Sequence, residues 1–359
     1  MKKSMKSILT LALVAVMCVG LFAACSQPQT TGDEPAETES AAGTPAAEEP
    51  SASGSADNTG AGNDITAKIG ITFQDLSNEF VANEKKALTA YVAENYPNIE
   101  LLILDGAGDA SNQVGQMENF INQGVDAIIC NPQESTALQP SYEAAIAAGI
   151  PVVSVGTDIN EKVGQVWSSC PDIPGAEKQV EYMTSLFDDD KVIDVAIMRG
   201  VIGHQAEILR SEGYDNVINQ NPDKYNIVFD QSANYSREEG LALMENWLSS
   251  GKNIDAVIAQ NDEMALGAAE AVKSAGLQDQ IKIFGIDGIE DAVNGVKDGT
   301  LSATLYQDGT QIITNAFDLA LKSIQGEAVS DIAIDQQLCT KDNVQEFLDK
   351  IKYLADLPS

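Results

Sequence analysis

The 359-residue sequence is poor in histidine and in basic residues. Its single histidine, His204, excludes a metal site built from several histidines, and a histidine-dependent catalytic triad would have to use this one residue. Lysine and arginine number 21 against 54 aspartates and glutamates, which gives a formal net charge of −33. So acidic a surface repels phosphate backbones, and we therefore expect no nucleic acid among the partners.

Motifs of catalysis and of cofactor binding are also missing. The sequence contains no Walker A loop, no Gly-x-Ser-x-Gly elbow and no Cys-x-x-Cys pair. The segment Asp105–Asp109 (DGAGD) follows an apolar run, but it lacks the third glycine of a dinucleotide fingerprint and is interpreted as a turn. We therefore expect a protein that is not an enzyme and that needs no cofactor and no metal.

The N-terminus has the pattern of a targeting segment. Three lysines precede an apolar run from Ile8 to Ala24, which is short for a membrane-spanning helix. The last residues, Leu21–Cys25 (LFAAC), resemble a bacterial lipobox, although Phe22 stands where an aliphatic residue is usual. Residues 1–24 are thus predicted to be a lipoprotein signal peptide, with Cys25 diacylated, and two acyl chains suffice for stable anchoring. The alternative is an ordinary secretory signal cleaved nearby.

Residues 25–65 are predicted to form a disordered acidic tether behind the lipidated cysteine. Positions 26–65 hold eight acidic residues, no lysine or arginine and almost no large apolar side chain. Such a segment cannot bury a core, and its charges repel one another, so it would hold a folded region off the membrane.

Of the five cysteines, three lie beyond the signal and the lipobox, namely Cys130, Cys170 and Cys339. Their number is odd and their spacing does not resemble a metal site. We predict no structural disulfide, although an exported chain could form one. Cys130 ends a strand-like run and is predicted to be a small buried hydrophobic residue.

From Lys68 onward, short apolar runs alternate with amphipathic stretches such as 78–95 and 236–248. Continuous apolar runs bounded by Gly, Asp or Asn are typical of parallel strands that are buried on both faces. The predicted strands are Ile69–Phe73, Leu101–Leu104, Ala127–Cys130, Val152–Val155, Val192–Met198, Ile227–Phe229, Ala256–Ala259, Ile281–Ile286 and Ala303–Tyr306. The alternation predicts a doubly wound α/β fold. Four strands precede a break near Glu161–Gly175 and about five follow, which favours two sheets over one wide sheet.

Polar and aromatic side chains follow the ends of these strands, where ligands bind in such sheets. They lie in the segments Gln74–Phe80, Gly156–Asp158, Arg199–His204, Asp230–Tyr235, Gln260–Glu263, Asp287–Gly288 and Gln307–Asp308. Amides and carboxylates can hydrogen-bond ligand hydroxyls in pairs, and aromatic rings can cover the C–H face of a sugar. Individual residues, Ser77 and Asp262 among them, could instead be helix N-caps. The convergence of the whole set at one edge favours a site for a sugar or polyol.

Residues 66–340 resemble the sugar-binding proteins of bacterial ABC transporters, within the type I periplasmic binding protein superfamily, and above all its ribose- and galactose-binding members. The matching segments are Asn131-Pro132, Gly149–Val153, Ala259–Gly267 (AQNDEMALG), Phe284–Gly288 (FGIDG) and Leu301–Gln307 (LSATLYQ). The resemblance implies two α/β lobes, joined by three crossings near Cys170, Gln307 and Gln336, that close on a ligand by hinge motion. The implied lobes are residues 66–169 plus 308–335 and residues 170–307 plus 336–359.

The resemblance also implies a set of ligand-binding residues, carried over position by position. Asn78 and Phe80 would belong to the first-lobe wall, Tyr235 would stack on the ligand, and Asn261, Asp287 and Gln307 would bind hydroxyls. The remaining candidates are Thr157, Asp158, His204 and Gln205.

The sequence departs from the family pattern in three ways. The family's Asp-Arg pair after the fourth strand falls on Gly156-Thr157, one residue before Asp158, and the family's second arginine falls on Ile208. Arg210 is expected to face elsewhere on its helix. Val81 stands at a second aromatic position. Loss of both guanidinium forks disfavours ribose, and His204, Gln205 or Glu207 are expected to substitute for them.

The sequence thus predicts a lipid-anchored, extracytoplasmic and monomeric solute-binding protein. It would bind a monosaccharide or a related small polyhydroxylated ligand and deliver it to an ABC permease with its ATPase. The alternative is a receptor that presents a bound sugar or furanosyl signal to a membrane sensor kinase or chemoreceptor. A transcription regulator of the lactose-repressor type shares this fold, but it would need an N-terminal DNA-binding region with basic charge.

Overall fold

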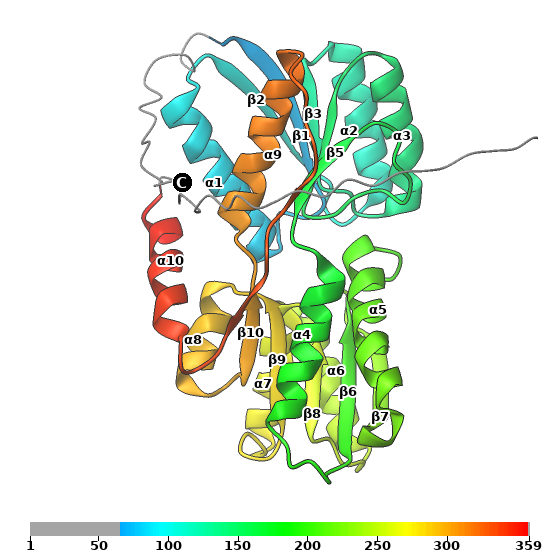
Figure 1. Cartoon of the computed structure of the whole chain (residues 1–359), viewed down its shortest axis with the longest axis vertical. Helices are drawn as coiled ribbons and strands as arrows, with labels where there is room; N and C mark the ends of the chain where they lie inside the picture. Colours follow the sequence, from blue (N-terminus) through cyan, green and yellow to red (C-terminus); the bar gives the residue numbers. More distant parts are fainter. Residues whose placement is uncertain (1–64, 358–359) are drawn as a thin grey trace, which may run out of the picture. The chain divides into compact units, whose positions relative to one another are not determined.

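The computed structural model describes residues 65–357, which form two parallel-stranded sheets of six strands each. The first sheet has the order β11-β5-β4-β3-β1-β2 and the second the order β12-β10-β9-β8-β6-β7. Every pairing is parallel except that of β12 with β10, which is antiparallel. The predicted α/β class with two sheets is therefore confirmed (Figure 1). The predicted signal peptide, Cys25 and tether lie outside the described residues.

The first lobe consists of the first sheet and the helices packed on it. Its strands and helices are β1 (Ala67–Phe73), α1 (Glu79–Asn95), β2 (Ile99–Asp105), α2 (Ala110–Gln123), β3 (Ala127–Cys130), α3 (Ser135–Ala147), β4 (Val152–Val155), β5 (Val166–Ser169), α9 (Gly309–Ile324) and β11 (Ile332–Ala333). Helices α1 and α9 share one hydrophobic cluster with the sheet, and α2 and α3 share another. The sheet is thus covered on both faces.

The second lobe is built in the same way around the second sheet. Its strands and helices are α4 (Asp172–Ser185), β6 (Ile193–Arg199), α5 (Gln205–Gln220), the 3-10 turn η1 (Pro222–Lys224), β7 (Tyr225–Ser232), α6 (Arg237–Ser249), β8 (Ala256–Ala259), α7 (Asp262–Ser274), β9 (Lys282–Asp287), α8 (Glu290–Asp298), β10 (Ala303–Tyr306) and β12 (Gln337–Cys339). Helices α4 and α5 pack on one face of the sheet, and α6, α7 and α8 pack on the other.

The apolar runs form strands because each residue finds a hydrophobic layer on its own side of the sheet. In β3, Ala127 and Ile129 belong to the cluster with α1 and α9, whereas Ile128 and Cys130 belong to the cluster with α2 and α3. Successive side chains of a strand point to opposite faces, so a strand between two helical layers must be apolar throughout. Cys130 is fully buried, as predicted, and Cys130, Cys170 and Cys339 are free thiols.

Three short strands carry too weak a pattern to be predicted. β5 lies inside the segment interpreted as a break, and only two of its four residues are apolar. β11 and β12 comprise two and three residues at the edges of the two sheets. Edge strands bury less of their surface than central strands, so their sequences need not be continuously apolar.

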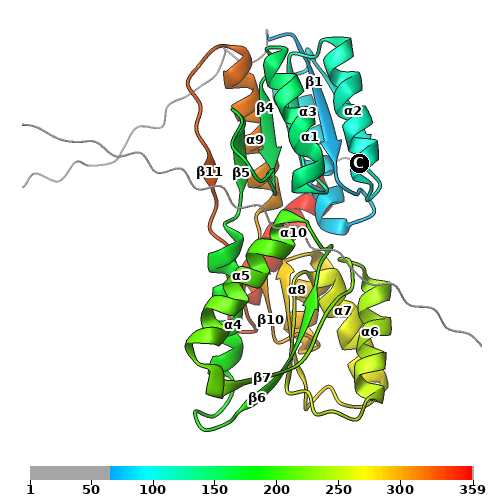
Figure 2. The same cartoon turned by 90° about the vertical axis from the view of Figure 1, so that its right-hand side faces the viewer.

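The chain passes between the lobes at three places, as the family resemblance implies (Figures 1 and 2). The passages follow β5 at Ser169, β10 at Tyr306 and β11 at Ala333. The last helix, α10 (Val344–Asp356), then contacts both lobes. Its Phe347 and Ile351 belong to a second-lobe cluster, while Leu354 packs against the first-lobe cluster of α1 and α9.

Candidate functional site

A cavity lies where the carboxyl ends of the strands of both lobes meet. The first lobe lines it with Gln74, Asn78, Phe80, Val81, Glu84, Asn131, Gly156, Thr157 and Ile312. The second lobe lines it with His204, Ala206, Arg210, Tyr235, Asn261, Asp287 and Gln307. The cavity therefore stands where the rule for parallel sheets places a ligand.

Eight of the ten predicted ligand-binding residues line this cavity. They are Asn78, Phe80, Thr157, His204, Tyr235, Asn261, Asp287 and Gln307. The residues come at or after the ends of seven different strands, so the sheet topology brings them together.

The structure places Asp158 and Gln205 outside the lining of this cavity. The Asp158 carboxylate accepts hydrogen bonds from Ser154 and Gln165 of its own lobe, at 2.5 and 3.1 Å. The Gln205 side chain crosses to the first lobe, where its Oε1 accepts the backbone N–H of Asp158 at 2.6 Å. Both side chains are thus committed to protein contacts. Glu207, the third proposed substitute, is held by Arg199 at 3.2 Å and does not line the cavity either.

Asn78 and Asn261 cap helices and also line the cavity. Asn78 Oδ1 accepts the backbone N–H of Val81 and caps α1, and Asn261 Oδ1 accepts that of Met264 and caps α7. Both also line the cavity. A cap uses the amide oxygen, and the amide N–H₂ group can still donate. The caps are thus not Ser77 and Asp262, the two residues that the sequence suggested for this role.

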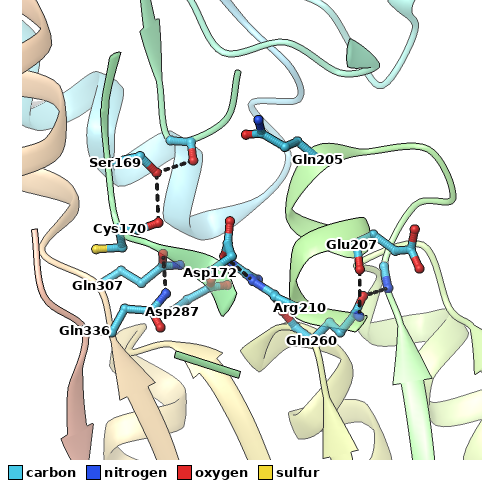
Figure 3. A network of polar contacts seen from close by, with 12 residues as sticks. Ser169, Cys170, Asp172, Gln205, Glu207, Arg210, Gln260, Asp287, Gln307 and Gln336 are labelled. Atoms are coloured by element: carbon cyan, nitrogen blue, oxygen red, sulfur yellow. Dashed lines mark hydrogen bonds and ion pairs between the residues drawn. The ribbon is translucent and has the colours of Figure 1, made fainter. Parts of the chain in front are cut away.

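The prediction for Arg210 is wrong, because this residue does line the cavity. Its helix α5 buries Ala206, Arg210 and Tyr214 on one stripe of positions four apart, whereas Ile208 is 45% exposed. Arg210 Nε donates to Asp172 Oδ1 at 2.7 Å, and Nη1 donates to the backbone oxygen of Gln260 (Figure 3). One guanidinium is therefore available at this site after all. The helical spacing from Ala206 would have revealed it.

Tyr235 reaches the cavity through an unusual backbone. Asn234 and Tyr235 both have positive φ angles, of 53° and 61°, which a bulky residue rarely adopts. A Cβ atom on Gly200 would come within 1.9 Å of Tyr235 Cζ, so only glycine leaves room for this ring. The surroundings thus fix the ring as a wall of the cavity.

His204 joins the two lobes as a neutral group. Its Nε2 lies within hydrogen-bond distance of Gln74 Oε1 of the first lobe, and its Nδ1 lies 3.4 Å from the Tyr235 hydroxyl. Because an amide oxygen can only accept, Nε2 carries the proton and Nδ1 accepts from Tyr235. Burial, aided by the nearby Arg210 charge, lowers the pKa of His204 to about 3. His204 is therefore a fixed hydrogen-bonding group rather than a proton carrier near neutral pH.

Asp287 connects the cavity to two of the three interlobe passages. Its Oδ1 accepts from Gln307 Nε2 at 2.9 Å, and Gln307 Oε1 accepts from Gln336 Nε2 at 3.1 Å (Figure 3). Asp287 has a φ of 135°, a strained value for a residue with a side chain. Burial raises the pKa of the Asp287 carboxyl well above its usual range, although Arg210 opposes this shift. The chain of amides fixes the carboxyl in the cavity wall.

Glu84 is a cavity residue that the sequence analysis missed. It is 1% exposed, and its Oε1 is buried without a hydrogen-bond partner. Burial, and secondarily Asp287, raises the pKa of Glu84 well above its usual range. The signal was its position, because Glu84 stands on the buried stripe of α1 between Val81 and Leu88. An acidic residue is rarely fully buried unless it is paired.

The arrangement can bind a hydroxylated molecule without reacting with it. Amide, carboxyl and guanidinium groups surround the cavity, and the Phe80 and Tyr235 rings add apolar faces. Within residues 65–357, no cluster of three or more His, Cys, Asp or Glu side chains could hold a metal ion. Over the same range, no helix is both long and apolar enough to span a bilayer.

Comparison with known proteins agrees with this geometry. Residues 69–328 match the model of the periplasmic binding protein domain family. The chain is 35% identical over 295 residues to the xylitol-binding protein of Mycolicibacterium smegmatis, covering 81% of this chain and 82% of that protein. It is also 35% identical over 271 residues to the ribose import binding protein RbsB of Bacillus subtilis, covering 75% and 85%.

A solved structure shows the same fold over the same range. An ABC transporter solute-binding protein from Bacillus halodurans, with bound myo-inositol, superposes with a TM-score of 0.76 at 34% identity. The match covers 81% of this chain and all of that one. These relatives are binding proteins, in agreement with the prediction that the chain is not an enzyme. The two lobes, the cavity between them and the match over residues 69–328 show that this chain belongs to the periplasmic binding protein family.

Proposed function

We propose that the protein is the solute-binding component of an ABC importer and that it binds a monosaccharide or a related polyol between its lobes. The observation that carries this proposal is the composition of the cavity wall. Asn78, Asn261, Asp287 and Arg210 offer paired donors and acceptors for adjacent hydroxyls, and Phe80 and Tyr235 offer ring faces for C–H groups. The names of the relatives, which refer to xylitol, ribose and myo-inositol, support the same ligand class.

The proposed mechanism is closure of the two lobes on the ligand. Residues 66–169 with 308–335 would move against residues 170–307 with 336–359, and α10 would follow the second lobe while it touches the first. Contacts such as Gln74 with His204 already span the lobes and would favour the closed form. The closed form would then present a surface to the permease, with the protein acting as a monomer.

The protein is proposed to work outside the cytoplasm, held by lipid on Cys25. The support for this anchor is the lipobox-like sequence at residues 21–25. Metabolic labelling with a fatty acid tests it. Label in the wild-type protein and none in Cys25→Ala would support the anchor, and equal absence of label from both would contradict it.

Isothermal titration of the full chain against a panel of pentoses, hexoses, furanoses and polyols tests the ligand class. We expect at least one member of the panel to bind with a 1:1 stoichiometry. No binding to any member of the panel, together with clear binding of amino acids or nucleosides, would contradict the proposal.

A further inference from the structure

Glu84 places in the cavity wall a buried carboxyl oxygen, Oε1, that has no partner among the described residues. The Glu84 side chain lies beside the cavity and is only 1% exposed. No donor in residues 65–357 forms a hydrogen bond with its Oε1. A buried polar atom without a partner costs about 1–3 kcal/mol, and more when the group is charged. Because most buried polar groups are paired, an unpaired carboxyl at a ligand cavity indicates a donor on the ligand.

The cavity wall holds more carboxyl groups than cations. Among the residues that line it, Glu84 and Asp287 carry carboxyls and Arg210 carries the cation. The charge of Arg210 is already matched by Asp172, whose carboxylate is 2.7 Å from Nε and equally buried. Lys86 lines a neighbouring cavity and bonds the backbone oxygen of Leu354 at 2.8 Å. Two buried carboxyls therefore face the ligand without a cation of their own.

We propose that the cavity selects polyhydroxylated ligands that carry a protonated amine, and that Glu84 is the group that binds this amine. The inference rests on the proposed function and narrows it to one class of polyol. An ammonium group offers three donors and a positive charge, whereas a hydroxyl offers one donor and no charge. Because the Glu84 side chain is buried, an added cation next to it is attracted far more strongly than it would be on a surface.

Matched pairs of ligands that differ only in one group test this inference by titration of the full chain. Suitable pairs are 2-amino-2-deoxy-glucose with glucose, 2-amino-2-deoxy-galactose with galactose, and an amino-deoxy-inositol with inositol. We expect the amine of at least one pair to bind at least tenfold more tightly than its hydroxyl partner. An equal or greater affinity for the hydroxyl partner in every pair would overturn the inference.

Substitution at Glu84 separates a direct contact from a general preference. Glu84→Gln keeps the shape of the side chain and removes its ability to become a carboxylate. It should lower the affinity for the amine ligand at least tenfold and change the affinity for the hydroxyl partner by less than threefold. The matched control is Glu94→Gln, an exposed change on the same helix, which should alter neither. Equal weakening of both ligands by Glu84→Gln would contradict the proposed contact.

The outcomes also distinguish this inference from the proposed function. If the hydroxyl partners bind and the amines are not preferred, the proposal of a polyol ligand is supported and the inference of an amine ligand is overturned. That result would assign Glu84 the role of a protonated donor to a hydroxyl. If no member of any pair binds to a chain that shows an intact thermal unfolding transition, both the proposed function and this inference are overturned.

Discussion

The two lobes supply different kinds of side chain to the same cavity. The second lobe contributes groups that are already fixed by buried bonds, namely Arg210 on Asp172 and Asp287 on Gln307. The first lobe contributes the Phe80 ring, the Asn78 amide and the unpaired carboxyl of Glu84. The second lobe thus holds its charged cavity groups by bonds of its own, whereas the first lobe leaves Glu84 Oε1 without a partner among the described residues. Changes in the second lobe should therefore have the larger effects.

The largest expected effect is on stability, at the buried pair of the second lobe. Arg210→Met leaves the Asp172 carboxyl without its partner and should lower the free energy of unfolding by about 3–5 kcal/mol. Urea unfolding of the ligand-free protein measures it. The double variant Arg210→Met with Asp172→Leu should recover much of the loss, since no buried charge then remains. A single variant as stable as the wild type would show that the pair does not hold the second lobe.

The next largest effect is on binding. Asp287→Ala should weaken the best ligand of the panel at least about 100-fold, because a carboxyl loses two or more hydrogen bonds of about 1.5–3 kcal/mol each. Titration measures the affinity. The empty protein should unfold at nearly the same temperature, and the exposed second-lobe change Asp298→Ala serves as the control. A collapse of the empty Asp287→Ala protein would instead make this residue a structural one.

Glu84 should affect how the free energy of unfolding changes with pH. Burial raises the pKa of Glu84 above its unfolded value, so the folded protein keeps a proton that the unfolded chain releases. Its contribution to stability is present below about pH 4.5 and is lost as the pH rises through the folded pKa. Asp287 and Arg210 face the same cavity, and both residues are unchanged in the wild type and in the Glu84→Gln variant that is compared with it.

Glu84→Gln removes this contribution. The fall in unfolding free energy with rising pH should therefore be shallower in the variant, by up to about 1.4 kcal/mol per pH unit. Urea unfolding of the ligand-free proteins at pH 5, 6 and 7 checks it. Parallel curves for the wild type and the variant would contradict a buried, protonated Glu84.

The smallest effect is expected at the contact between the lobes outside the cavity. Gln205→Ala removes one hydrogen bond, to the backbone N–H of Asp158, and one such bond contributes about 0.5–1.5 kcal/mol. The affinity should fall by less than about tenfold, and titration next to Asp287→Ala measures the contrast. A loss as large as that of Asp287→Ala would mean that Gln205 contacts the ligand, as the sequence first suggested.

The sequence carries much information about the central strands and little about the edges. β3 and β8 are apolar throughout because helices cover both of their faces, so they were predicted to the residue. β5, β11 and β12 lie at or near sheet edges, where short and partly polar sequences suffice. The fold class needed only the central strands, and it was predicted correctly.

The site could be predicted where a residue directly follows a strand, and less well where it lies within a helix. Asn261 and Asp287 come at strand ends, so topology places them in the cavity. Arg210 and Glu84 stand in the second turns of α5 and α1, and only the phase of each helix brings them inward. The Asp158 carboxylate is occupied by Gln165, which is near in sequence, and Gln205 is occupied by the distant backbone of Asp158. A single sequence reveals neither pairing.

A crystal structure with the tightest-binding member of the panel would test the account most directly. The account predicts one ligand molecule in the cavity, in contact with Phe80 or Asn78 from the first lobe and with Asp287 and Arg210 from the second. A ligand bound elsewhere, or bound in the cavity through one lobe alone, would contradict it.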